Sequence, residues 1–107
     1  MREIMGSLRI ASAEIWELRL YVADRSPKCL LAIENLEDTC QTYLAGRYQI
    51  EVVDLQENPR RAADDQVLAV PTLVRKLPEP VRKVVGDLSD TDRLLAGLQL
   101  RRMHGAT

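Results

Sequence analysis

The sequence predicts an α/β domain in which helices cover a mixed β-sheet. Its first part, residues 15–55, reads as a strand, a long helix and a second strand, which together form a βαβ unit with a parallel strand pair. A later segment, residues 72–85, reads as a β-hairpin. A last amphipathic helix begins at Asp90. With a short helix between the βαβ unit and the hairpin, the predicted order is βαβαββα.

Length and charge limit the classes of protein that this chain can represent. Its 107 residues suit one domain, and 15 basic against 16 acidic side chains give a net charge of -1. This balance argues against broad nucleic-acid binding. No apolar run approaches the roughly 20 residues of a membrane span, and residues 1–14 lack a signal-peptide pattern, so we expect a cytoplasmic protein without membrane contact. We expect a flexible lead-in over 1–14, the domain over 15–101 and a flexible tail over 102–107.

The βαβ unit follows from two periodicities. Apolar and polar residues alternate from Ile15 to Ala23, which predicts a strand. Ser26 and Pro27 then provide an N-cap and a first helical residue, and Gly46 is suited to ending the helix. Alternation returns from Tyr48 to Leu55. The apolar stripe of the predicted helix consists of Cys29, Ile33, Leu36, Cys40, Tyr43 and Leu44.

The second half is punctuated by proline and glycine. Asn58 and Pro59 begin a short predicted helix that reaches about Leu68. Strands are predicted at Thr72–Val74 and Val81–Val85, around the breaker Pro78-Glu79-Pro80, and Pro71 stands where a cis peptide bond is acceptable. Gly86 and Asp87 make a turn. Ser89 and Asp92 resemble a capping box for the last helix, which reaches about Leu100, and Arg101 and Arg102 suit the negative end of that helix.

This element order is the thioredoxin-like arrangement, which places its redox motif at the start of the first helix. Here the motif reads Ser26-Pro27-Lys28-Cys29, and a serine supplies no thiolate for disulfide exchange. Cys29 is either a small buried apolar residue or a reactive thiol. Cys29 and Cys40 lie on one predicted helix, roughly 16 Å apart at 1.5 Å per residue, so they are expected to be unpaired.

The residues themselves indicate no enzyme, metal or cofactor. His104, in the tail, lacks partners for metal binding or catalysis, and the adjacent Asp64 and Asp65 are expected to face water. Basic residues gather around the second helix and the hairpin. They form either ordinary surface charge or a docking face for an acidic partner, and a charged sheet edge can also accept an extended segment by strand addition. They are Arg60, Arg61, Arg75, Lys76, Arg82 and Lys83.

Several motifs in this chain resemble those of the KaiB family, the small partners of the circadian-clock ATPase KaiC. The resemblance spans Leu18 to Leu100 without a large gap. The matching stretches are Leu18-Arg19-Leu20-Tyr21-Val22-Ala23, Ser26-Pro27, Val53-Asp54-Leu55, Asn58-Pro59, Ala69-Val70-Pro71-Thr72-Leu73, Leu77-Pro78-Glu79-Pro80-Val81-Arg82-Lys83 and Gly86-Asp87-Leu88-Ser89.

The resemblance implies a binding protein without enzymatic activity or a cofactor. Members of the family bind the N-terminal ATPase ring of KaiC, compete there with a sensor histidine kinase that carries a similar domain, and recruit KaiA. They also adopt two folds, a tetramer with a rearranged C-terminal half and a thioredoxin-like monomer. The residue pattern of this chain favours the thioredoxin-like, fold-switched form, because Thr72 to Val85 reads as strands.

The resemblance and the charge pattern together suggest site residues. The expected partner-binding residues are Arg25, Lys28, Asn58, Arg60, Val70, Arg75, Lys76, Arg82 and Lys83. The expected structural residues are Pro71, Gly86, Asp87, Gly97 and Gln99.

The chain departs from the family pattern near its end and in its partner-binding half. It reads Gly97-Leu98-Gln99-Leu100-Arg101-Arg102 where the family has an aspartate and a tyrosine, so we expect a monomer or dimer rather than a tetramer. Leu31, Glu34, Glu51 and Gln66 replace residues that are usually basic. Two alternatives stay open: a sensor or adaptor domain of a two-component system, ranked lower because no kinase region follows Thr107, and a thiol redox protein.

Overall fold

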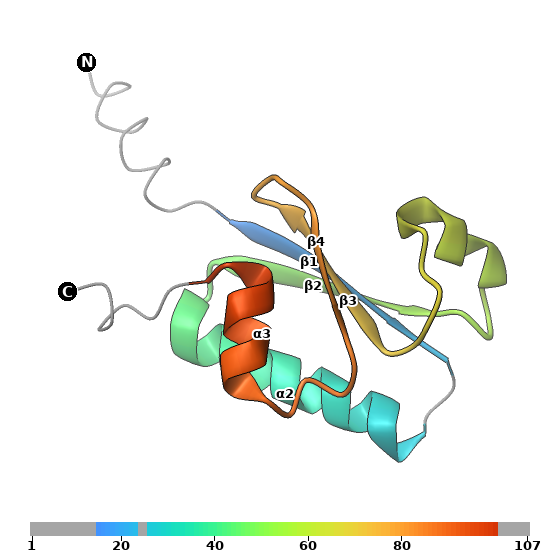
Figure 1. The fold of residues 1–107 in the computed structure, drawn as a ribbon, viewed down its shortest axis with the longest axis horizontal. Helices are drawn as coiled ribbons and strands as arrows, with labels where there is room; N and C mark the ends of the chain where they lie inside the picture. Colours follow the sequence, from blue (N-terminus) through green and yellow to red (C-terminus); the bar gives the residue numbers. More distant parts are fainter. Residues whose placement is uncertain (1–14, 24–25, 101–107) are drawn as a thin grey trace.

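A computed structural model of the chain describes residues 15–23 and 26–100 and contains a mixed four-stranded sheet (Figure 1). Its elements are β1 (Trp16–Val22), α2 (Pro27–Leu44), β2 (Tyr48–Asp54), the 3₁₀ helix η1 (Pro59–Asp65), β3 (Thr72–Leu77), β4 (Arg82–Val85) and α3 (Thr91–Leu98). The strand order is β2-β1-β3-β4. β1 is parallel to β2 and antiparallel to β3, which is antiparallel to β4. The predicted order and the mixed sheet are confirmed.

α2 begins and ends where the local sequence predicts. The Ser26 side chain accepts a hydrogen bond from the Cys29 amide at 3.3 Å, and Pro27 is the first helical residue. At the other end Ala45 and Gly46 both have positive φ, 49° and 84°, so the backbone turns out of the helix there. The buried residues of α2 are Cys29, Ala32, Leu36, Thr39, Cys40 and Leu44, which is close to the predicted stripe.

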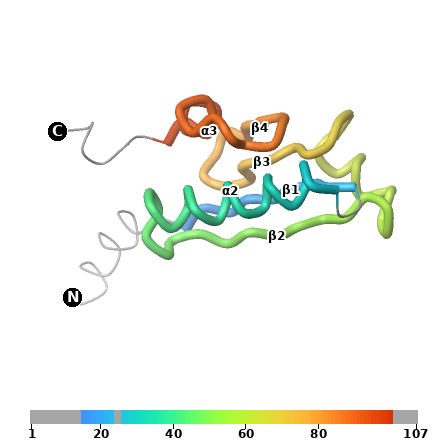
Figure 2. The backbone as a smooth tube through the Cα atoms, turned by 90° about the horizontal axis from the view of Figure 1, so that it is seen from below, coloured from blue at the N-terminus to red at the C-terminus, as the bar shows by residue number. Residues whose placement is uncertain are grey.

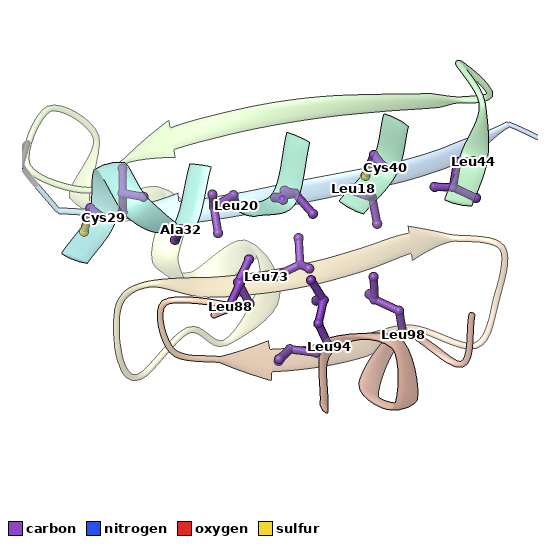
Figure 3. Packing of buried hydrophobic residues seen from close by; sticks show 13 residues of the cluster. Leu18, Leu20, Cys29, Ala32, Cys40, Leu44, Leu73, Leu88, Leu94 and Leu98 are labelled. Atoms are coloured by element: carbon purple, nitrogen blue, oxygen red, sulfur yellow. The ribbon is translucent and has the colours of Figure 1, made fainter. Parts of the chain in front are cut away.

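The main core lies between the sheet and the two α-helices, which cover the same face (Figures 1 and 3). Because side chains alternate along a strand, Leu18 and Leu20 of β1 point to this face together with Leu73 of β3. Figure 3 shows Leu94 and Leu98 of α3 pointing toward these strands, and α2 covers the same face over β1 and β2 while α3 packs on β4. Apolar burial on this face is the main favourable contribution to folding.

Two predicted elements need correction. The second helix is a 3₁₀ helix that ends at Asp65, not a helix to about Leu68, because Gln66 has a left-handed backbone (φ 54°) and its amide bonds back to Ala62 and Ala63. The last helix is capped by Asp90, whose carboxylate accepts from the Arg93 amide at 3.1 Å, and not by Ser89. Figure 2 shows η1 at the end of the molecule where α2 begins.

The hairpin is confirmed, although its second strand begins at Arg82 rather than at Val81. The Val70-Pro71 bond is cis, as the sequence allows, and so are Leu77-Pro78 and Glu79-Pro80. After β4 the Gly86 amide donates to the Pro71 carbonyl at 2.9 Å, with φ 124° at Gly86. Only glycine adopts such a backbone without strain.

Some predictions fall on residues outside the described part of the chain. They concern the lead-in 1–14 and the tail 102–107, together with Arg25, Arg101, Arg102 and His104. The domain boundaries therefore stay predictions. Within the described residues, no helix is long and apolar enough to cross a membrane.

Candidate partner-binding surface

The sheet has a second face that neither α2 nor α3 covers, and we call it the open sheet face. Tyr21, Val53 and Val74, from three adjacent strands, form a small buried cluster there, separate from the main core. Leu55, Val67 and Val70 pack against this cluster. By strand alternation, Arg19, Glu51, Lys76, Lys83 and Val85 also belong to this face. The open sheet face thus combines a small apolar centre with several charged side chains.

Asp65, the last residue of η1, is the centre of a buried hydrogen-bond network on this face. One carboxylate oxygen accepts from the Tyr21 hydroxyl at 2.5 Å and from the Arg19 guanidinium at 3.0 Å. The other accepts from Lys76 Nζ at 2.5 Å. Asp65 is only 7% exposed, so the expectation that it faces water together with Asp64 is wrong. Asp64 is exposed and bonds Arg61 instead, at 2.8 Å.

This network keeps Asp65 charged although it is buried. Burial alone raises the pKa of its carboxyl group, but the hydrogen bonds from Lys76 and Tyr21 and the nearby positive charges outweigh that effect and lower the pKa. Burial and the bond to Asp65 raise the pKa of Tyr21. The hydrogen bond to Tyr21, helped by the nearby carboxylates of Asp65 and Glu51, raises the pKa of Arg19 against the opposing effect of burial. Asp65 is therefore a carboxylate and Tyr21 a neutral phenol at physiological pH.

Alternating charges extend from the buried network to the surface. Arg19 Nε donates to Glu51 at 2.9 Å, and Arg61 donates to the second oxygen of Glu51 at 3.3 Å. The bond from Arg61 and the charge of Arg19 lower the pKa of Glu51. Between β1, β2 and β3 lies a shallow depression of about 340 Å³, which Arg19, Glu51 and Lys76 help to line. Such a polar depression can receive a side chain of another protein.

Several of the predicted partner-binding residues lie near η1 and the hairpin. Asn58 and Arg60 are exposed at the start of η1. Val70 packs on the open sheet face, where Lys76 is partly exposed. Lys83 Nζ reaches the Gln66 carbonyl at 3.3 Å and so connects β4 to the loop after η1.

Three other predicted residues are not part of this group. Arg82 is exposed on β4 but, by alternation with Lys83, projects from the opposite face. Lys28 is exposed in the first turn of α2. Arg25 lies outside the described residues.

Arg75 is not a surface residue, which corrects its placement among the exposed basic residues. It is 3% exposed, because it lies on the helix-covered side of β3. Its guanidinium donates to the Leu98 carbonyl at the end of α3 and to the Pro80 carbonyl at 2.6 Å, and lies 5.3 Å from the centre of the Trp16 ring. A cation at a helix C-terminus is favourable. Arg75 therefore joins α3 to the hairpin and is unavailable to a partner.

Three of the predicted structural residues, Asp87, Gly97 and Gln99, lie in α3 or near its ends. The Asp87 carbonyl accepts from the Asn35 side chain of α2 at 2.9 Å, and its carboxylate accepts from the Ser89 amide at 3.0 Å. A Cβ atom on Gly97 would come within 2.5 Å of Val84, so α3 packs closely on β4 only with glycine there. Gln99, with φ 57°, ends α3. Together these contacts fix α3 against the sheet.

The two thiols do not form a redox site. Cys29 and Cys40 are free and buried, as expected, and burial raises the pKa of Cys40 to about 12. The Ser26 hydroxyl, at the position of a first redox cysteine, caps α2. Over residues 15–23 and 26–100, no group of three or more metal-ligating side chains is found. Cys29 and Cys40, with a serine at position 26, therefore lack the arrangement that disulfide exchange requires.

Comparison with known proteins gives the family. Residues 19–100 match the KaiB domain, which covers every described strand and helix except the first residues of β1. The chain belongs to the KaiB family. It is 43% identical over 96 residues to the circadian clock oscillator protein KaiB of Acaryochloris marina, covering 90% of this chain and 88% of that protein. It is 46% identical over 83 residues to the KaiB of Prochlorococcus marinus, covering 78% and 71%. These relatives are named as clock proteins and not as enzymes, which confirms the expectation of a non-enzymatic protein.

Solved structures confirm the thioredoxin-like fold. The N-terminal domain of SasA from Synechococcus elongatus has a TM-score of 0.66 and 20% identity, covering 80% of this chain and 85% of that one. The thioredoxin Deadhead of Drosophila melanogaster has a TM-score of 0.63 and 14% identity, covering 88% and 89%. At these identities the similarity concerns the fold alone.

Proposed function

We propose that this chain is a KaiB-type regulatory protein that binds the N-terminal ATPase ring of a KaiC-type protein in the cytoplasm. The observation that carries the proposal is the KaiB match over residues 19–100, together with relatives named as circadian clock oscillator proteins. A protein of this kind acts by occupying a surface of its partner and needs no reactive group. The buried thiols, and the use of Ser26 as the N-cap of α2, agree with such a role.

The surface around η1 and the hairpin is the proposed contact with the ATPase ring. Asn58 and Arg60 are exposed there, and Lys76 and Lys83 lie on the open sheet face beside them. We propose that three further residues also contact the ring. They are Arg82 at the start of β4, Val70 before β3 and Lys28 in the first turn of α2. Exposed cations of this kind steer an acidic partner surface and select it against neutral or basic ones.

A second candidate function is that of a sensor or adaptor domain in a two-component system. It is supported by the similarity of fold to the N-terminal domain of SasA. The identity to that domain is 20%, against 43% and 46% to the KaiB relatives, so the KaiB-type function is favoured. The two functions need not use different surfaces, because two domains of one fold can compete for one partner. Recruitment of KaiA and competition with such a kinase domain are further parts of the proposal.

Binding to a purified KaiC-type ATPase ring tests the proposed function directly. The full chain is expected to be retained by the immobilised ring, and the Arg60→Glu variant to bind about tenfold more weakly because a charge is reversed in the contact. Arg93→Glu is the matched control, since Arg93 is an exposed arginine of α3 outside the proposed contact. Failure of the unmodified chain to bind the ring would contradict the proposal. Equal weakening by Arg60→Glu and Arg93→Glu would show that the ring does not bind specifically at the surface around η1 and the hairpin.

Sedimentation velocity of the same protein tests the proposed assembly. We propose a monomer or dimer, because the family aspartate and tyrosine near the chain end are replaced here. In this fold Gln99 ends α3 with a left-handed backbone, and Gly97 is packed against Val84. A stable tetramer would contradict this part of the proposal without affecting binding to the ring.

A further inference from the structure

The outer edge of β4 is suited to pairing with a further strand, and its residues Arg82, Lys83 and Val85 are exposed. Within residues 15–23 and 26–100, no strand pairs with it, because β4 is last in the order β2-β1-β3-β4. The Gly86 amide bonds to the Pro71 carbonyl across the β3–β4 ladder. In an antiparallel pair every second residue points its backbone groups at its partner strand, so Val84 and Arg82 face β3. Lys83 and Val85 therefore direct their amide and carbonyl groups outward, where a further strand can bond to them.

Apolar side chains gather beside this edge. Leu68 is 98% exposed and Val85 is 49% exposed. A groove of about 190 Å³ lies between the loop after η1 and β4, and Leu68, Ala69, Lys83 and Val85 are among the residues that line it. On the other side of β4 lies a mixed cavity of about 70 Å³, lined by Val84, Leu88 and Leu94 and also by Asp90 and Arg93. The edge thus has an apolar groove at its Val85 end on the open sheet face.

The other end of the same edge is positively charged. Arg82 and Lys83 are both exposed, and they project to opposite faces of the sheet by strand alternation. A strand that pairs with β4 meets apolar surface opposite Val84 and Val85 and positive charge opposite Lys83 and Arg82. Opposite charges across a strand pair are favourable and like charges are not.

We infer that the outer edge of β4 is a docking site for an extended segment of a partner protein that adds to the sheet as a fifth strand. In antiparallel pairing, the segment runs opposite to β4 and carries two apolar residues followed by two acidic residues. Its backbone bonds to Lys83 and Val85, its first apolar side chain enters the groove beside Leu68, and its acidic side chains meet Lys83 and Arg82. Strand addition of this kind takes affinity from the backbone and specificity from alternate side chains.

Charge argues against a second copy of this chain as the occupant. Antiparallel pairing of two β4 strands would set Arg82 and Lys83 of each copy opposite Val85 and Val84 of the other, leaving four cations without an acidic partner along one strand pair. Lysine on an edge strand is a common device that prevents such pairing between identical chains. An acidic and apolar segment turns the same charges into a favourable contact.

A synthetic peptide with the central sequence Val-Val-Glu-Glu, labelled with fluorescein, tests the inference by fluorescence anisotropy with the full chain. We expect saturable binding, weakened about tenfold or more by Lys83→Glu and restored when the peptide reads Val-Val-Lys-Glu. Arg47→Glu is the control, since Arg47 precedes β2 at the opposite edge of the sheet. A peptide with the order Glu-Glu-Val-Val is expected to bind more weakly, because its charges then lie opposite the apolar end.

The backbone contribution is tested separately from charge. Val85→Pro removes an outward amide and leaves the bonds between β3 and β4 in place, so binding is expected to be lost while circular dichroism shows a folded protein. N-methylation of the peptide amides that pair with β4 is the second test, and it leaves the protein unchanged. No saturation up to about 1 mM peptide, or binding indifferent to N-methylation, would overturn the inference. Binding of the ATPase ring is measured independently, so failure of one proposal leaves the other intact.

Discussion

The two faces of the sheet are closed in different ways. The helix-covered face buries an apolar cluster that includes Leu20, Leu73 and Leu94, each of them 0% exposed. On the open sheet face, the buried apolar centre that the described residues form is smaller and consists of Tyr21, Val53 and Val74. There the neighbouring η1 is joined to the sheet by the buried carboxylate of Asp65, which accepts hydrogen bonds from Arg19, Lys76 and Tyr21, and by the more exposed bond from Arg61 to Glu51.

This difference separates stability from recognition. Apolar burial is strong, has no directional requirement and depends little on pH, so the helix-covered face determines whether the domain folds. Hydrogen-bonded charges are worth less overall, but they fix geometry and remain sensitive to pH and salt. The open sheet face can therefore present charged groups to a partner without any loss of apolar burial in the main core. Four changes test this division, from the largest expected effect to the smallest.

Leu20→Ala is expected to have the largest effect. It leaves a cavity in the main core and should lower the free energy of unfolding by about 3 kcal/mol in urea denaturation. Val52→Ala, on the edge strand β2, is the control, because Val52 is 45% exposed. The free energy of unfolding of Val52→Ala should fall by no more than about 0.5 kcal/mol. Equal losses for the two variants would mean that burial in the main core is not the main source of stability.

Asp65→Ala removes the centre of the hydrogen-bond network on the open sheet face. It removes the common acceptor of Arg19, Lys76 and Tyr21, so the free energy of unfolding should fall by about 2 kcal/mol. Because Arg19 and Lys76 are partly exposed, water can hydrogen-bond to them in the variant, and this reduces the loss of stability. Asp64→Ala is the matched control, since it removes only an exposed ion pair with Arg61, and such pairs contribute little to stability. Similar melting temperatures for the two variants would contradict the buried network.

Gly97→Ala tests how closely α3 packs on β4. The added methyl group meets Val84 at 2.5 Å, so overpacking should cost about 1 kcal/mol net of the better helix propensity of alanine. Val84→Ala should remove the clash, so that the double variant is more stable than the sum of the two single changes predicts. Additive changes in the free energy of unfolding would show that the contact does not limit the position of α3.

Acid should selectively weaken the open sheet face. The pKa of Asp65 is lowered in the folded protein, so its contribution to stability is present above the ordinary carboxyl pKa of about 3.9 and is lost as pH falls through the folded value. The difference in free energy of unfolding between the unmodified chain and Asp65→Asn should therefore shrink as pH falls below about 4. Denaturation curves at several pH values measure it. A difference that grows toward low pH would have the wrong sign.

The elements of the fold could be predicted because their signals are local. Alternation of apolar and polar residues predicts a strand, as in β1. A helical period with a cap predicts a helix, as in α2 with Ser26 and Pro27 at its start. The prolines and Gly86 likewise defined the hairpin and its turn. Such signals depend on neighbours within a few residues, so one sequence is enough to read them. The same local segments contain the motifs that resemble those of the KaiB family.

The roles of Asp65 and Arg75 were decided only by the tertiary structure. Asp65 stands beside Asp64 in a polar stretch, and its partner Arg19 is 46 residues away, so nothing local distinguishes the buried carboxylate from the exposed one. Arg75 resembles its neighbour Lys76, but the pleat of β3 turns it under α3, toward carbonyls at Leu98 and Pro80. Burial of a charged group depends on which distant groups the folded sheet places around it. That information exists only once the strands have come together.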